Sequence, residues 1–135
     1  MYSKIMVPVD MRHRERSQKA LDTAADLARH FGATMILLTV DHPLGHHSLQ
    51  ELPEQHKPAF DAFVAEEKAA LGVDKLEAVF SHADVAHQRI REEAEHLRVD
   101  LIVMHSHDPR LSDYLFGSNA SRVVLHAPCS VMVVR

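Results

Sequence analysis

Short apolar runs alternate with longer amphipathic segments along the chain. Three runs are nearly continuous in hydrophobic residues, as strands covered on both faces of a sheet should be, and they span residues 5–9, 35–40 and 101–104. Residues 131–134 form a fourth run, and residues 76–80 form a weaker fifth. Apolar side chains recur at helical spacing in the intervening segments, which predicts helices over residues 21–31, 60–71, 86–97 and 118–125.

The ends of the predicted helices carry the expected stop signals. Gly32 and Gly72 follow the first two helices at the position of a left-handed cap, and Pro128 stops the last helix. The resulting order, strand and helix in strict alternation, predicts an α/β domain with one open, five-stranded parallel sheet and helices on both faces. Residues 41–53, with two prolines and three histidines, are expected to form a surface loop.

Composition and charge indicate a single domain and exclude some classes of binding partner. The 135 residues, 46% of them hydrophobic, suit one compact domain over residues 1–135. A formal net charge of −4 provides no broad basic surface, so we expect no nucleic-acid partner and no membrane insertion. The single cysteine, Cys129, cannot form an internal disulfide, and the chain starts without a signal-like segment, so we expect the cytoplasm. Twelve histidines make the charge sensitive to pH near neutrality.

Candidate ligand-binding residues follow the predicted strands, because open α/β sheets bind ligands at the carboxyl ends of their strands. These ends carry Pro8, Val9 and Asp10, then Val40, then Met104, His105, Ser106 and His107. Asp10 has two interpretations: it accepts hydrogen bonds from ribose hydroxyls, or it stabilises the turn that follows it. The neighbouring run from Arg12 to Arg16 is typical of a solvated helix face.

Gly117, Ser118 and Asn119 open the last predicted helix. A glycine, a hydroxyl and free N–H groups at a helix N-terminus favour a phosphate, but the same residues also serve as an ordinary turn and N-cap. His105 and His107 lack the further ligands that zinc requires, so we predict no metal site there. Ser106 beside His107 is not interpreted as a nucleophile with its base, because neighbouring side chains point apart.

The motifs at the two ends of the chain together resemble the universal stress protein family. They are Lys4-Ile5-Met6-Val7-Pro8-Val9-Asp10, then Ser106-His107-x-Pro109, Tyr114 to Ala120 and His126 to Arg135, and the last three resemble the bacterial F and G types. The resemblance implies a Rossmann-like sheet in the order 3-2-1-4-5, a homodimer formed through the last strand, and ATP or AMP, with or without Mg²⁺, at the strand ends. It implies that Pro8, Val9 and Asp10 frame adenine and ribose, that Val40 contacts adenine, and that Gly117, Ser118 and Asn119 hold the phosphates.

The chain departs from the ATP-binding pattern of the family at two positions. His105 and Asp108 stand where those members have glycine, and Arg110 can offset the charge of Asp108. The leading hypothesis is a nucleotide-binding stress or regulatory protein that signals to a protein partner through its bound state. Two alternatives stay open: a nucleotide-free dimeric interaction module, and a slow ATPase or autophosphorylating protein, although a P-loop lysine is missing. A receiver-like phosphoacceptor domain ranks below both.

Overall fold

The computed structural model describes residues 1–41, 53–106 and 119–135. Five strands run through it: β1 (Lys4–Pro8), β2 (Thr34–Asp41), β3 (Leu76–His82), β4 (Leu101–His105) and β5 (Ser130–Val134). The helices are α1 (Gln18–Phe31), α2 (Lys57–Leu71), α3 (Ala86–His96) and α4 (Asn119–His126). Two 3₁₀ segments, η1 (Met11–Ser17) and η3 (Pro53–Gln55), precede α1 and α2. Each predicted strand and helix is therefore present.

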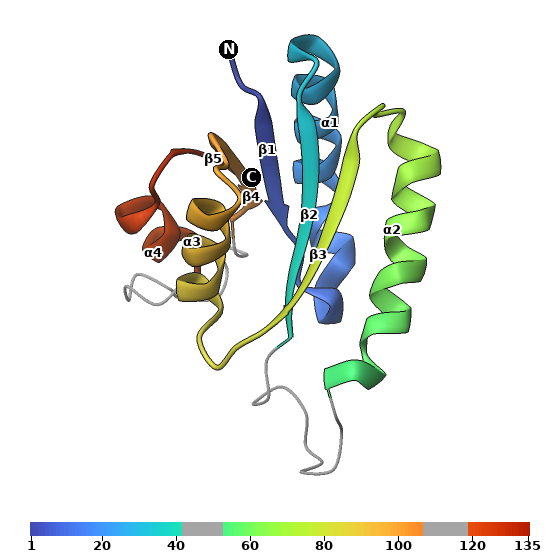
Figure 1. Ribbon diagram of the computed structural model, residues 1–135, viewed down its shortest axis with the longest axis vertical. Helices are drawn as coiled ribbons and strands as arrows, with labels where there is room; N and C mark the ends of the chain where they lie inside the picture. The colour runs from blue at the N-terminus through green and yellow to red at the C-terminus, as the bar shows by residue number, and fades with distance from the viewer. Residues whose placement is uncertain (42–52, 107–118) are drawn as a thin grey trace.

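The strands form one parallel sheet in the order β3-β2-β1-β4-β5, as expected (Figure 1). β1 lies at its centre, where Ile5 is in register with Met35 of β2 on one side and with Leu101 of β4 on the other. β3 extends to His82, two residues beyond its apolar run, because Ser81 and His82 pair with the last residues of β2. Main-chain pairing does not require apolar side chains, so this end could not be read from hydropathy.

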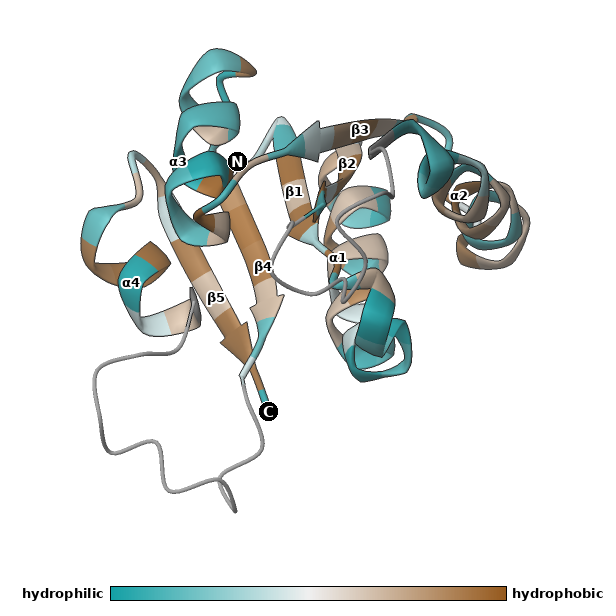
Figure 2. Ribbon diagram, turned by 90° about the horizontal axis from the view of Figure 1, so that it is seen from below, coloured by the Kyte–Doolittle hydropathy of each residue, from teal (hydrophilic) through white to brown (hydrophobic). Residues whose placement is uncertain are grey.

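Helices cover both faces of the sheet and divide the core in two. On one face, α1 and α2 pack on the sheet through residues such as Leu21, Phe60 and Phe63. On the other, α3 and α4 pack through residues such as Ile90, Ala94 and Val123. Figure 2 shows the two helical layers and the apolar strands between them. The burial of β1, β2 and β4 on both faces explains their nearly continuous apolar sequence, whereas β3 and β5, at the edges of the sheet, are more exposed.

The two predicted glycine caps are confirmed. Gly32 ends α1 with φ +65°, and Gly72 ends α2 with φ +62°. This left-handed conformation is strained for residues with a Cβ atom, so glycine ends both helices at low cost. The side chain of Arg29 reaches across from α1 to the carbonyl oxygen of Leu71 at the end of α2, which ties the two helices together.

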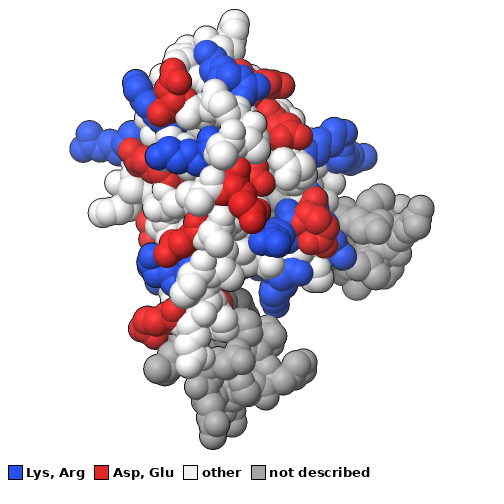
Figure 3. All heavy atoms as spheres, turned by 90° about the vertical axis from the view of Figure 1, so that its right-hand side faces the viewer, with Lys and Arg blue, Asp and Glu red and all other residues white. Residues whose placement is uncertain are grey.

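The surface carries both signs of charge. On the face that presents α2, acidic and basic side chains are interspersed without a patch of one sign (Figure 3). In the described ranges, no helix is long and apolar enough to cross a membrane.

Candidate functional site

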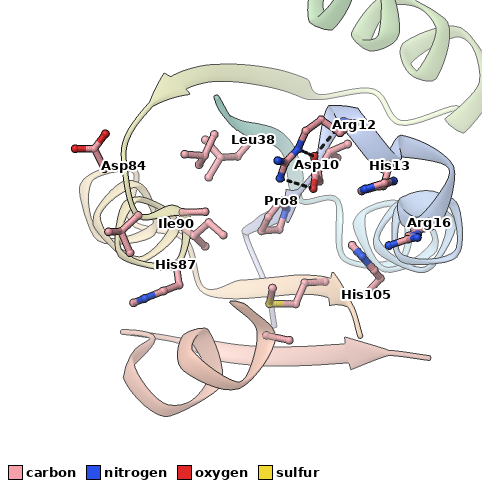
Figure 4. A pocket seen from close by; sticks show the side chains of 16 residues that line it. Pro8, Asp10, Arg12, His13, Arg16, Leu38, Asp84, His87, Ile90 and His105 are labelled. Atoms are coloured by element: carbon pink, nitrogen blue, oxygen red, sulfur yellow. Dashed lines mark hydrogen bonds and ion pairs between the residues drawn. The ribbon is translucent and has the colours of Figure 1, made fainter. Parts of the chain in front are cut away.

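A cavity of about 350 Å³ opens at the carboxyl ends of β1, β2 and β4. η1 borders it on one side and the first turn of α3 on the other (Figure 4). The cavity lies where β1 has β2 on one flank and β4 on the other, so the connections that leave the sheet diverge there. Ligands of open α/β sheets bind at such a point. The position is the one that the strand ends predict.

The structure places half of the predicted site residues in the wall of this cavity, namely Pro8, Val9, Asp10, Val40, Met104 and His105. Ser106 is described but is not part of this wall, and its N–H donates to the carbonyl oxygen of Val134 at 2.9 Å. Asn119 begins α4, and its neighbour Ala120 lines the cavity. Four predicted residues lie outside the described ranges and their roles stay predictions: His107, Arg110, Gly117 and Ser118.

The inner wall of the cavity is apolar. Leu38 is fully buried, and Ile90 and Met104 are 4% and 5% exposed. These three side chains come from β2, α3 and β4 and belong to the core beneath α3 and α4. An apolar inner wall with polar groups at the rim is the usual composition of a small-molecule site. It suits a flat, weakly polar group that enters first and carries its polar groups outward.

Asp10 and Arg12 form a two-point ion pair at the rim. The Arg12 guanidinium donates from Nε to Oδ1 and from Nη2 to Oδ2, each at 3.1 Å, and the Arg12 backbone N–H donates to Oδ1 at 3.0 Å. The Asp10 side chain therefore caps the first turn of η1, as one of the two sequence interpretations predicted. Since a carboxylate offers about four acceptor positions, Arg12 leaves room for roughly one more hydrogen bond.

This pairing keeps both groups charged. Burial alone would raise the pKa of Asp10, but the hydrogen bonds and the charge of Arg12 outweigh burial and hold that pKa below its usual value. The hydrogen bond from Arg12 to Asp10 raises the pKa of the guanidinium in turn. The two charges largely cancel, so the Asp10 side of the rim presents a neutral pair rather than a free carboxylate.

Comparison with known proteins identifies the family. The model of the universal stress protein family matches residues 1–135. Universal stress protein G of Shigella flexneri is 33% identical over 149 aligned residues, which cover the whole of both chains. This chain belongs to the universal stress protein family. The resemblance drawn from its N-terminal and C-terminal motifs is thereby confirmed.

Solved structures of universal stress proteins share the fold. One in complex with cAMP has a TM-score of 0.77 at 21% identity, with 98% of this chain and 96% of that chain covered. The universal stress protein of Archaeoglobus fulgidus in complex with dAMP has a TM-score of 0.72 at 23% identity, with coverages of 99% and 98%. At these identities the likeness is one of fold. It places this family member among Rossmann-like α/β proteins.

Sequence reasoning missed the contribution of η1 to this family member's cavity. The run from Arg12 to Arg16 lies beside the Asp10 end of the sheet but was interpreted as a solvated helix face, whereas Arg12, His13 and Arg16 all line the cavity. The run forms a 3₁₀ segment with a kink at His13, whose φ of −137° and ψ of 42° are not helical. Its position directly after Asp10 was the available signal.

The sequence predicted a helix from residue 86, but not that the start of this helix contributes to the cavity. Asp84, Val85, Ala86 and His87 line the cavity opposite η1. Burial comes first among the causes that lower the pKa of His87, and the nearby charges of Arg122, Arg91 and His126 lower it further. The segment carries no ligand-binding motif, and it follows the weakest apolar run of the chain.

A second polar cluster lies at the end of β2. The Asp41 carboxylate is 11% exposed and contacts the His56 Nδ1 atom at 3.0 Å and the His82 Nδ1 atom at 3.4 Å. The His56 Nδ1 atom forms a hydrogen bond with the carboxylate, and both imidazoles form ion pairs with it when they are protonated. These contacts join the start of α2 to the ends of β2 and β3. The part of the chain that the structure describes contains no group of three side chains placed to hold a metal ion.

Cys129 has the environment of a core residue. It is half-buried beside the core under α3 and α4. Burial raises the pKa of its thiol, and the charge of Asp100 raises that pKa further. A raised pKa disfavours the reactive thiolate.

Proposed function

We propose that this universal stress protein binds an adenine nucleotide, ATP or AMP, in the cavity at the ends of β1, β2 and β4. The observation that carries the proposal is the cavity itself, which joins an apolar inner wall to a charged rim at the divergence point of the sheet. Its volume of about 350 Å³ is near the lower end of the range for ligand pockets, about 300–1,000 Å³. Family members solved with cAMP and dAMP support the same class of ligand.

Successive regions of the cavity wall suit the base, the ribose and the first phosphate of a nucleotide. The base packs against Leu38, Ile90 and Met104, where burial of its faces supplies most of the affinity. The ribose lies toward Pro8 and Asp10, and a ribose hydroxyl takes the acceptor position that Arg12 leaves on the Asp10 carboxylate. The first phosphate then reaches the rim, and the further phosphates of ATP, with or without Mg²⁺, extend beyond the cavity.

The bound state acts through a homodimer in this proposal, in a stress or regulatory response in the cytoplasm. β5 is at the edge of the sheet, with β4 on its one paired side. Apolar side chains are exposed on and near it: Met132 is 37% exposed, Val133 39% and Leu125, in α4, 72%. An unpaired strand edge with exposed apolar residues favours association with a second copy. β5 is paired with β4, and Met104 and His105 of β4 line the cavity. The proposed ligand-binding cavity and the proposed dimer surface are therefore next to each other.

The test is calorimetric titration of nucleotide-stripped protein with AMP, with ATP and with ATP plus Mg²⁺. Saturable binding is expected to disappear in Val40→Trp, because the indole fills a half-buried position in the cavity wall. Asp10→Ala is expected to weaken binding about 10-fold or more, the usual effect of losing a hydrogen bond to a charged group.

A matched change separates filling of the cavity from general damage. Val64→Trp alters another half-buried valine, on α2, outside the cavity wall, and is expected to bind like the wild type. Circular dichroism checks that all variants fold. Folded wild-type protein that binds none of these nucleotides would overturn the proposal and make the nucleotide-free interaction module the leading function.

A further inference from the structure

The charges around the cavity are unevenly placed. Arg12, His13 and Arg16 line the η1 side, and Figure 4 shows His13, Arg16 and His105 together on that side. Asp84 and His87 lie on the opposite side, at the start of α3. Because Asp10 neutralises Arg12, the charge that remains on the η1 side, among the cavity-lining residues that the structure describes, is that of Arg16.

Arg16 differs from Arg12 in its partners. Arg12 is held on both oxygens of Asp10, whereas Arg16 has no ion pair with any carboxylate in residues 1–41, 53–106 and 119–135. Arg16 is exposed at the rim, so its guanidinium keeps its planar set of donors available to a ligand. That donor set matches two oxygens of one phosphate group better than a lysine or histidine does.

We propose that Arg16, assisted by His13, binds the first phosphate of the nucleotide on the η1 side of the cavity. This inference rests on the proposed function and specifies it: the preferred ligand is a nucleoside phosphate rather than the neutral nucleoside. It assigns the first phosphate to a segment next to β1, whereas the family resemblance pointed to residues 117–119. Arg12 remains on Asp10, whose carboxylate holds the ribose, while Arg16 selects for the negative charge.

The test compares AMP with adenosine, which differ by the phosphate alone. In the wild type, AMP is expected to bind at least 10-fold more tightly than adenosine, as for a charge-assisted hydrogen-bonding contact. Arg16→Ala is expected to reduce the affinity for AMP by about 10- to 100-fold and to leave that for adenosine unchanged. Arg16→Lys keeps the charge but loses the paired donors, so its affinity for AMP should lie between those two proteins.

Arg14→Ala is the matched control. Arg14 is an exposed arginine of the same 3₁₀ segment that does not line the cavity, so its removal lowers the net charge equally but should leave both affinities unchanged. Equal loss of AMP affinity in Arg14→Ala and Arg16→Ala would overturn the inference, since only a diffuse charge effect would remain. Undiminished AMP affinity in Arg16→Ala would overturn it too. Absence of binding by both ligands would overturn the proposed function along with it.

Discussion

Asp100 accepts two hydrogen bonds from Ser3, although 97 positions of the sequence separate them: the Ser3 N–H lies 2.8 Å and its hydroxyl 2.9 Å from Oδ2 of Asp100. The Lys4 N–H donates to the other oxygen at 3.0 Å. These contacts fasten the start of β1 to the start of β4, at the opposite end of the strands from the cavity. Burial would raise the pKa of Asp100, but these hydrogen bonds lower it below its usual value.

Asp100→Asn is therefore expected to lower the free energy of unfolding near pH 7, by about 1–2 kcal/mol. A carboxylate whose folded pKa is depressed stabilises the protein above its unfolded pKa of about 3.9, and this contribution is lost as the pH falls through the folded value. Urea unfolding of both proteins at neutral and acidic pH checks this: their difference should shrink below about pH 4. Asp74→Asn, at an exposed aspartate, should have no such effect. A gap independent of pH would contradict the assignment.

Glu67 shows the opposite linkage. It lies on α2 with 8% of its surface exposed, and burial, followed by the charges of Asp22 and Glu66, raises its pKa above the usual value even though Gln18 lowers it. A raised folded pKa means that the wild type loses stability as the pH rises from the unfolded pKa, about 4.3, through the folded one. Glu67→Gln should therefore increase the free energy of unfolding near neutral pH.

Thermal unfolding at several pH values measures this effect. The gain from Glu67→Gln should vanish below about pH 4, where the carboxyl group of the wild type is protonated in both states. Glu66→Gln, at the exposed neighbour, serves as the control and should change stability little. Destabilisation by Glu67→Gln near neutral pH would show that the ionised carboxylate is satisfied in the folded protein.

Removing the Arg12 side chain should release the Asp10 carboxylate. In Arg12→Ala only the backbone N–H still donates to Asp10, so the pKa of Asp10 should rise toward its ordinary value, which a carboxyl-carbon NMR titration follows. Stability should change by less than about 1 kcal/mol, because the pair is partly exposed. Adenosine, which has no charge, should bind more tightly, because its ribose meets a carboxylate with free acceptor positions. Unchanged adenosine affinity would place the ribose away from Asp10.

The exposed edge of β5 predicts that two copies of the chain associate through this strand. Val133→Asp places a charge on the proposed dimer surface and is expected to convert the dimer into a monomer, as measured by light scattering after size exclusion. Ala78→Asp, at an exposed position of β3 on the opposite edge of the sheet, is the matched control and should stay dimeric. A monomeric wild type would contradict a β5 interface. Dissociation of both Val133→Asp and Ala78→Asp would contradict it as well.

The topology could be predicted because burial on both faces leaves a direct mark on the sequence. The runs around Ile5, Leu37 and Ile102 have apolar residues at successive positions, and Gly32 and Gly72 mark helix ends through a conformation that other residues adopt at a cost. The spatial order of the strands has no such mark. That order followed from the family resemblance, since periodicity does not state which strand pairs with which.

The cavity was only partly predictable. Asp10, Val40 and Met104 were found because each stands at the end of an apolar run. Arg16 was not, because its approach to the cavity depends on the 3₁₀ form of η1 and the kink at His13, and a run of charged residues resembles any solvated helix. His87 was missed because residues far apart in the sequence define its surroundings.

The central position of β1 affects how the chain folds during synthesis. β1 can pair with β2 early, but its other edge stays open until Leu101 and its neighbours in β4 have left the ribosome. At about 5–20 residues per second, several seconds separate these two pairings. During that time a strand whose residues from Ile5 to Pro8 are all buried in the finished protein presents unpaired backbone groups. We expect the nascent chain to be most prone to aggregation, and most in need of chaperones, in this interval.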